Sequence, residues 1–433
     1  MPHPLAPPPV TVAGRRVVAP DVERVNATLR FDAAAKEAEG LATVDFLAGK
    51  ADGRAALDLR QTVEWARLDG KDIKVDDFAA ADVGAGKDAR MRILDFELEA
   101  GSRHRLEVGY ALGRPDAEAA EPIGWGDGGV RFDFWMSDLY PGRYLEMWAP
   151  APLVHDRFTL SVDVEIHGSD KRHALIANTA GVDAATGGRR WSLCYPAHFS
   201  SLSPMLVLCP AEEVEIRRSA VRLPGRERSL GVVCARDLNV DVDLGATDAD
   251  VTSWLVYLAS RYGPWFHGDT FWAYIWEPRR GMEYDGATSA NVEALEHEVF
   301  HSWFGRGVKP ASAADGWMDE AWTTWATATK RSSGDFQRFA VADLGLDEPP
   351  VELYPQHPWS RHTPRAAYTE GARLFAGIAA LMGGAGRMRS AMADWYRANA
   401  GGAATTNGLA AHLTAWSGID VAPWWARYVH GRG

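Results

Sequence analysis

The run His297-Glu298-Val299-Phe300-His301, together with Glu320, decides how this sequence is interpreted. If the run is helical, its two histidines lie one turn apart on the same face, because residues four apart are neighbours on an α-helix. Two imidazoles at that separation can bind one Zn²⁺ ion, and a carboxylate from a second segment supplies a third ligand. We therefore predict a zinc site formed by His297, His301 and Glu320.

Three protein ligands leave one position of a tetrahedral zinc ion open for water, which is typical of a catalytic site. Glu298 follows the first histidine, where its carboxylate can take a proton from that water. A helical wheel predicts one core-facing arc, with both histidines nearly opposite it. The arc consists of Val292, Leu295, Val299 and Trp303. The alternative, from the pattern alone, is a pair of packed histidines without a metal.

Four stretches, in chain order, resemble the motifs of one enzyme family. They are GMEY at 281–284, the histidine run continued as HSWFG at 301–305, GWMDEAW at 316–322, and YTEGA at 368–372. The set resembles the gluzincin zinc metallopeptidases of the aminopeptidase N and leukotriene hydrolase type, and is close to the glycyl aminopeptidase branch. The resemblance implies an aminopeptidase with one zinc ion per chain, in which Glu298 is the general base.

The same resemblance implies roles on the substrate side of the site. Tyr368 would stabilise the oxyanion of the tetrahedral intermediate. Glu283 would bind the free α-amino group of the substrate, which is cationic near neutral pH, and Gly281 and Met282 would lie beside it. Asp138 falls near the position of a glutamine that reaches the active site in relatives, so we predict that it contacts substrate.

Three positions depart from the family motifs. Arg280 stands where the family has the first glycine of its G-x-M-E-N motif, and Tyr284 stands in place of the final asparagine. Glu370 replaces the lysine that follows the catalytic tyrosine. We expect these departures to alter the choice of substrate more than the binding of zinc.

Composition limits the classes of partner. The 433 residues carry a formal net charge of −12, which argues against binding to nucleic acid or to an anionic membrane. No apolar run approaches the length of a membrane span, and the N-terminus lacks the pattern of a signal peptide. Three cysteines, an odd number, fit free thiols in a reducing compartment. We therefore expect a cytoplasmic protein. The family resemblance implies that its partners are peptides with a free N-terminus, and the oligomeric state is unknown.

The predicted architecture is an α+β multidomain fold. Residues 1–20 are expected to form a disordered, proline-rich tail, and residues 21–218 an antiparallel β-sandwich or saddle with period-two burial. Residues 219–433 are expected to form a thermolysin-like, mainly helical zinc catalytic domain. It includes a helix at 247–260, which Thr247 and Asp250 would cap. Larger members of the family carry a further C-terminal helical domain, which we expect to be absent here.

Two other functions remain open at this point. The first is a zinc endopeptidase or an epoxide-type hydrolase on the same fold, which would not need Glu283 as an amine anchor. The second is a catalytically inactive binding homologue, which would not need the complete set of His297, Glu298, His301, Glu320 and Tyr368.

Overall fold

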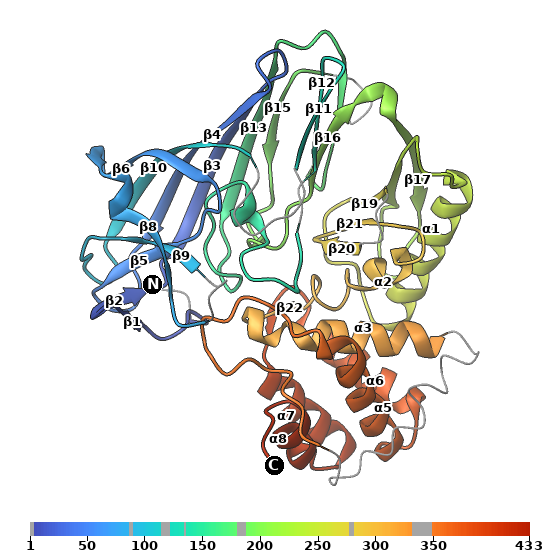
Figure 1. Ribbon diagram of the computed structural model, residues 1–433. Coiled ribbons are helices and arrows are strands. Elements are labelled where there is room, and N and C mark those ends of the chain that lie inside the picture. Colours follow the sequence, from blue (N-terminus) through green and yellow to red (C-terminus); the bar gives the residue numbers. More distant parts are fainter. Residues whose placement is uncertain are drawn as a thin grey trace. The chain divides into compact units, whose positions relative to one another are not determined.

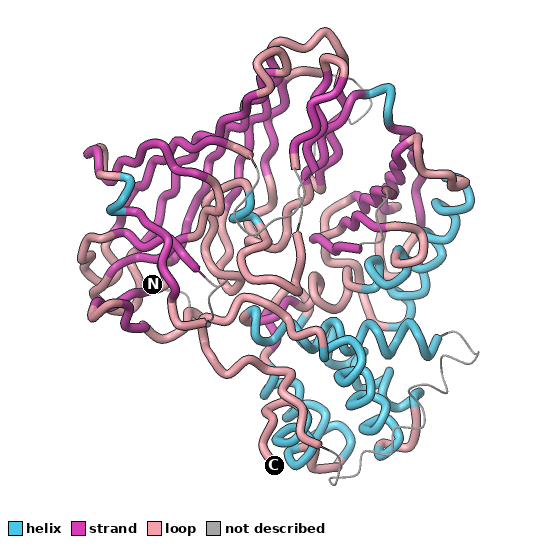
Figure 2. Tube along the Cα trace, viewed as in Figure 1, coloured by secondary structure: helices cyan, strands magenta, loops and turns pink. Residues whose placement is uncertain are grey.

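The computed structural model describes residues 4–85, 90–113, 122–133, 136–179, 188–276, 281–330 and 349–433. The chain divides into two compact units. The first unit consists of Met1–Ile216, Arg236–Asn239 and His357–Arg361, and the second of Arg217–Ala235, Val240–Gln356 and His362–Gly433. Strands predominate in the first unit, whereas the second combines a small sheet with most of the helices (Figures 1 and 2).

The largest sheet of the first unit has the strand order β15-β13-β3-β4-β10-β6-β7. Its strands are β15 (Arg190–Cys194), β13 (Thr159–His167), β3 (Asp21–Asp32), β4 (Glu37–Leu47), β10 (Arg103–Ala111), β6 (Thr62–Leu68) and β7 (Lys71–Ile73). Alternate residues of β3, from Val25 to Phe31, are buried, as the period-two pattern predicted. The sheet differs from the antiparallel prediction at one pairing, where β13 runs parallel to β3 with Thr159 opposite Arg24.

Two smaller sheets also belong to the first unit. One has the order β1-β2-β5-β9-β8, and the other β11-β12-β16-β14. Their strands are β1 (Val10–Val12), β2 (Arg15–Val18), β5 (Arg54–Leu57), β9 (Arg90–Leu94), β8 (Phe78–Asp82), β11 (Ile123–Gly126), β12 (Gly129–Asp133), β16 (Leu206–Pro210) and β14 (His173–Ala177). Three short 3₁₀ helices accompany them, η1 (Val75–Asp77), η2 (Leu145–Met147) and η3 (Ala211–Glu213).

The first twenty residues correct a prediction. Their proline content suggested a disordered tail, yet β1 and β2 form within them and β2 pairs with β5. Val17 and Val18 are buried, so the apolar residues that follow the prolines extend an existing sheet and gain burial from it.

Five residues ending at Arg361, far along the chain, complete the first unit. Trp359 is fully buried, and its indole N–H donates to the Pro8 carbonyl at 2.9 Å. The Arg361 guanidinium is buried between two carboxylates, with Nη1 2.5 Å from Oδ2 of Asp58 and Nη2 paired with Glu146. A segment distant in sequence thus neutralises buried acidic groups of this unit.

The sheet of the second unit has the order β17-β18-β19-β21-β20. Its strands are β17 (Val214–Val221), β18 (Leu230–Asp237), β19 (Thr270–Ile275), β20 (Gly281–Tyr284) and β21 (Ala287–Ala290). β19 and β21 are parallel, and among the described residues β20 pairs only with β21, in antiparallel register. The motif at 281–284 therefore lies on an edge strand.

Helix α1 (Leu244–Arg261) begins three residues earlier than predicted. The Asp243 carboxylate caps it by accepting from the backbone N–H groups of Gly245 and Ala246, at 2.8 and 3.1 Å. Thr247, the predicted cap, lies inside the helix, where its hydroxyl donates to the Asp243 carbonyl at 3.0 Å. The capping prediction was wrong because an aspartate closer to the loop satisfies the free N–H groups.

Six further helices lie in the described part of the second unit. They are α2 (Leu295–Phe300), α3 (Trp317–Lys330), α5 (Ala372–Leu381), α6 (Ala385–Asn399), α7 (Thr406–Ser417) and α8 (Ala422–Tyr428). A 3₁₀ turn η4 (Ala313–Gly316), a π-helical turn η5 (Ala367–Gly371) and the short strands β22 (Lys309–Pro310) and β23 (Ala403–Ala404) join them. The core includes Trp303, Trp317, Trp322 and Trp325, which are buried and therefore pack the fold.

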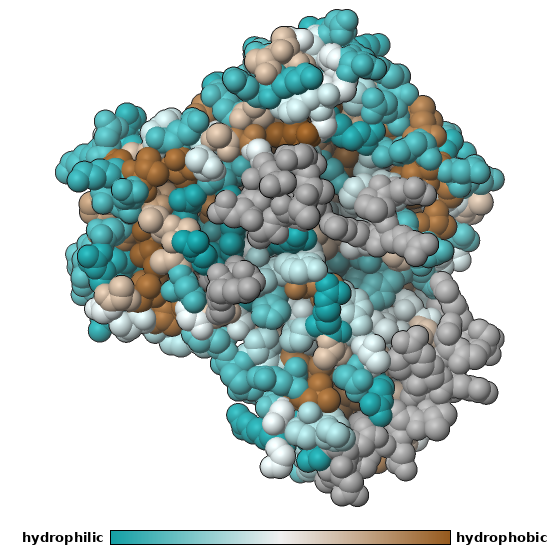
Figure 3. Space-filling model, in the orientation of Figure 1, coloured by the Kyte–Doolittle hydropathy of each residue, from teal (hydrophilic) through white to brown (hydrophobic). Residues whose placement is uncertain are grey.

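Hydrophilic side chains cover much of the face seen in Figure 3, and hydrophobic ones form smaller groups among them. Large hydrophobic side chains that are exposed in the described residues are scattered through both units. They are Leu5, Trp65, Tyr140, Leu238, Phe266, Val292 and Leu381. Within the described part of the chain, no helix combines the length and the apolar character needed to cross a membrane.

Candidate metal centre

Helix α2 carries the histidine run. Leu295 and Val299 are fully buried and anchor the helix in the core, and Trp303, just beyond its end, is buried as well. These positions confirm the predicted arc except at Val292, which is 46% exposed because it precedes the first helical residue. His301 is the C-terminal cap residue of this short helix.

Helix α3 supplies Glu320 from its first turn. Its start is fixed by Trp317, which is fully buried and donates from its indole N–H to the Thr406 hydroxyl at 3.0 Å. The neighbouring Asp319 accepts from the Glu320 backbone N–H at 2.7 Å. The carboxylate of Glu320 is thereby held in the buried interior, where it faces the end of α2.

The three predicted ligands converge. Nε2 of His297 lies 3.0 Å from Nε2 of His301 and 3.2 Å from Oε2 of Glu320, and the third side of the triangle, from His301 to Glu320, measures 3.5 Å. Ligand atoms about 2.0–2.1 Å from a tetrahedral zinc ion lie ~3.3 Å apart, so the spacing fits one such ion. These groups can therefore hold a metal together.

The second ring nitrogen of His301, Nδ1, is also positioned in a way that favours metal binding through Nε2. Nδ1 lies 3.1 Å from the Phe304 carbonyl oxygen, which can only accept, so Nδ1 carries the proton. Nε2 then presents its lone pair toward His297 and Glu320, as a metal-ligating histidine requires.

The electrostatics of the site favour a cation. Burial lowers the pKa of His301, but the carboxylates of Glu283 and Glu320 raise it by more, so that it lies well above its ordinary value. Burial raises the pKa of Glu320, but the two histidines outweigh this effect and lower it below its ordinary value. A positive charge placed between these groups is therefore stabilised.

Glu298 lies beside the triangle and is buried. Burial, and to a lesser extent the nearby Glu283 carboxylate, raise its pKa well above the ordinary value. Its carboxylate packs against the backbone of Gly281, where an added Cβ would lie 2.0 Å from Oε1. Gly281 therefore allows the closest approach of β20 to α2.

Glu283 lies on β20 opposite Thr288 and is buried. One of its carboxylate oxygens is within 4.8 Å of ligand atoms of both Glu298 and His301. Met282 precedes it and is also buried, and its carbonyl accepts from the Thr288 hydroxyl at 3.0 Å. The sequence-predicted Gly281, Met282 and Glu283 therefore all lie in the strand beside Glu298.

Tyr368 is placed by the π-helical turn η5, which precedes α5. Its hydroxyl donates to Oε1 of Glu320 at 2.6 Å, and its ring lies nearly parallel to that of His297, with centroids 6.2 Å apart. The π turn adds a residue to the turn that leads into α5. Single π turns of this kind are frequent at functional sites.

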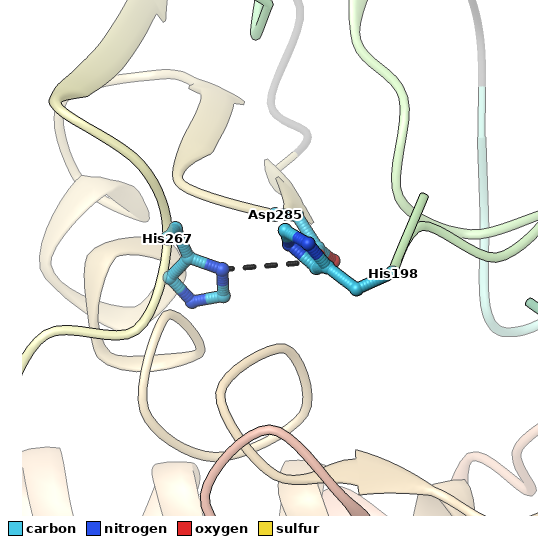
Figure 4. Close-up of side chains that lie close together, drawn as sticks. All are labelled: His198, His267 and Asp285. Carbon is cyan, nitrogen blue, oxygen red and sulfur yellow. Dashed lines mark ion pairs between the residues drawn. The ribbon is translucent and has the colours of Figure 1, made fainter. Parts of the chain in front are cut away.

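The hairpin of β20 and β21 is tied to the loop after α2 by a buried ionic network. Asp285 lies 2.5 Å from Nζ of Lys309 and 3.8 Å from Nδ1 of His267, as Figure 4 shows for the histidine. Nε2 of His267 donates to the Ser302 carbonyl at 2.7 Å. The network fixes the strand that carries Glu283 relative to the segment that follows His301.

The structure does not test two of the predicted positions. Asp138 belongs to the first unit, in the loop between β12 and η2, so its contact with substrate stays a prediction. Arg280 lies outside the described residues. Of the other departures, Tyr284 is fully buried and Glu370 pairs with Arg373 at 2.9 Å.

Sequence reasoning missed Arg306, which contacts Glu283 and is 1% exposed. A signal for it was present, because a charged residue interrupts the otherwise apolar and glycine-rich stretch from Trp303 to Val308. An arginine in such a stretch is buried with the rest, and a buried charge needs a partner.

Solved structures share this fold. A variant of an M1 zinc metallopeptidase from Deinococcus radiodurans aligns over 96% of this chain and 95% of its own, at 17% identity and a TM-score of 0.66. Legionella pneumophila aminopeptidase A, in complex with aspartic acid, aligns over 95% of this chain and 49% of its own, at 13% identity and a TM-score of 0.69. Native yeast LTA4 hydrolase aligns over 96% and 68%, at 13% identity and a TM-score of 0.64.

No protein-family model and no curated protein sequence matches the chain. The structural comparisons therefore establish the fold, and they confirm the predicted α+β class with an N-terminal sheet domain and a helical C-terminal part.

Proposed function

We propose that this protein is a zinc-dependent aminopeptidase that holds one zinc ion per chain and removes N-terminal residues from peptides. The observation that carries the proposal is the triangle of His297, His301 and Glu320, with sides of 3.0–3.5 Å, next to the buried carboxylate of Glu298. The solved structures that share the fold include zinc metallopeptidases and an aminopeptidase, which supports the same class of reaction.

Zinc bound by these ligands would activate a water molecule and polarise the carbonyl of the scissile bond. Glu298 accepts the proton of the attacking water and then delivers it to the leaving amine.

Glu283 gives the enzyme its exopeptidase character. The substrate's α-ammonium group binds its carboxylate, which lies close to both Glu298 and His301. An N-terminal residue anchored there places its own carbonyl, rather than one farther along the peptide, beside the general base.

Tyr368 stabilises the transition state from the Glu320 side of the site. Its hydroxyl, 2.6 Å from Glu320, can donate instead to the oxygen of the substrate carbonyl as negative charge develops there. A donor of this kind is worth about 3 kcal/mol in comparable sites.

Metal analysis and paired substrates test the proposal. We expect one zinc per chain, hydrolysis of leucine 4-nitroanilide, and no hydrolysis of its N-acetyl derivative. Glu283→Gln should raise KM for the free-amine substrate at least about 10-fold, since a charge-assisted hydrogen bond is lost. Cleavage of blocked peptides at internal bonds would instead indicate an endopeptidase, and zinc binding without any turnover would indicate an inactive homologue.

A further inference from the structure

Arg306 holds Glu283 through both its side chain and its backbone. Nη2 of Arg306 lies 3.0 Å from Oε1 of Glu283, and Nε donates to the Glu283 carbonyl at 3.3 Å. Both residues are buried. One rigid guanidinium therefore fixes the carboxylate and the strand that carries it, which a flexible ammonium group does less well.

The same guanidinium reaches the segments that carry metal ligands. Nη1 donates to the Gly305 carbonyl at 3.0 Å and lies 4.0 Å from Oδ2 of Asp319. Gly305 has a φ of +106°, and an added Cβ would lie 2.6 Å from that oxygen, so the backbone turn brings Arg306 inward. Asp319 in turn accepts from the Glu320 backbone N–H. Arg306 thus links β20 to the start of α3.

Glu283 needs this support because of its other neighbour. Its carboxylate and that of Glu298 are within 4.8 Å of each other, and both are buried. When both are ionised, two carboxylates at this distance repel strongly where water is excluded. Arg306 offsets this repulsion through its ion pair with Oε1 of Glu283.

We propose that Arg306 is a positioning residue that fixes Glu283 for recognition of the substrate's α-ammonium group and thereby sets the preference for free amines. The inference rests on the proposed aminopeptidase function. Without the guanidinium, Glu283 would turn away from Glu298 and bind the ammonium group less well.

The test compares two probes that differ only in the amine, L-leucine and 4-methylpentanoic acid. Their dissociation constants are measured by calorimetric titration of the zinc-loaded protein, which requires no turnover. Arg306→Gln should reduce the preference for leucine about 10-fold, because a displaced Glu283 carboxylate would lose its charge-assisted hydrogen bond to the ammonium group, and Arg306→Lys should restore part of the preference. Arg397→Gln is the control, since it removes an exposed arginine that pairs with Asp394 on α6 of the same unit.

A crystal structure of the zinc-loaded Arg306→Gln protein gives a second readout, in which the Glu283 carboxylate should be displaced by about 1 Å or more. The inference would be overturned if the Arg306→Gln protein kept the wild-type preference for leucine and left Glu283 in place. A stronger preference for leucine would also overturn it, because the guanidinium would then compete with the substrate's amine for Glu283. If Arg306→Gln fails to fold, the Arg306→Lys protein decides the test. A preference for leucine equal to that of the wild type would overturn the inference, and a reduced preference would support it. Absence of peptide hydrolysis by the wild type would refute the proposed function alone, because neither readout depends on turnover.

Discussion

Replacing Gly281 with alanine tests the arrangement of the general base with a single methyl group. The added Cβ would lie 2.0 Å from Oε1 of Glu298 and 2.5 Å from its Cδ, whereas unstrained contacts begin near 3.4 Å. The carboxylate must therefore move by roughly 1.4 Å, and a misplacement of about 1 Å at a reacting group costs on the order of 100-fold in rate. We expect a loss of about 100-fold in kcat, equivalent to about 2.7 kcal/mol of transition-state stabilisation.

The assay measures kcat on leucine 4-nitroanilide together with zinc content. Gly281 does not have a positive φ, so alanine fits its backbone, and zinc content should stay at the wild-type level because no predicted ligand is touched. Gly386→Ala, on α6, is the control, since an added Cβ there meets nothing within 4 Å and activity should be unchanged. A Gly281→Ala protein that keeps more than a third of wild-type kcat would refute the assigned position of Glu298.

Three further predictions address the chemistry, the fold and the thiols. Glu298→Ala should retain zinc and lose about 10²–10⁴-fold in kcat, as removal of a general base does; retention of most activity would contradict that role. Asp243→Ala removes the N-terminal cap of α1 and should therefore lower the free energy of unfolding by about 1 kcal/mol, measured by urea denaturation. An unchanged urea midpoint would contradict the capping geometry. At pH 8, a disulfide reagent should modify the exposed Cys194 quickly and the buried Cys209 and Cys234 only after unfolding, since burial raises the pKa of both buried thiols to about 12. The fold favours the neutral form of both buried thiols. Their contribution to the free energy of unfolding is therefore present below their ordinary pKa of 9.0 and declines as pH rises from there toward about 12. A urea midpoint of unfolding that does not fall above pH 9 would contradict this expectation.

The convergence of the candidate metal ligands could be expected from the sequence because part of its signal is local. The spacing of His297 and His301 sets their face of a helix, and the apolar positions at Leu295 and Val299 set which face is buried. Glu320 followed from the family resemblance, and the structure places its carboxylate 3.2 Å from His297. The pattern of apolar residues also gave the strand β3, because every second side chain is buried there.

What the sequence did not reveal depends on partners that are distant along the chain. Arg306 finds Glu283, 23 residues earlier, only once β20 and the loop after α2 are adjacent. The N-terminal strands form because β5 offers β2 an edge, which no local pattern encodes. Asp243 outcompetes Thr247 as the cap of α1 by a difference in backbone geometry that propensity alone does not resolve.

The five residues that end at Arg361 have a consequence for biosynthesis. Asp58 and Glu146 are buried carboxylates, and the guanidinium that neutralises them is translated 303 and 215 residues later. During synthesis on the ribosome, the ion pairs that Asp58 and Glu146 make with Arg361 therefore cannot form until most of the C-terminal half of the chain has been made. Expression of residues 1–218 as a separate fragment would remove the Arg361 guanidinium from both carboxylates and leave Asp58 paired with Arg60, so coexpression or a longer chain is the sensible route to material for study.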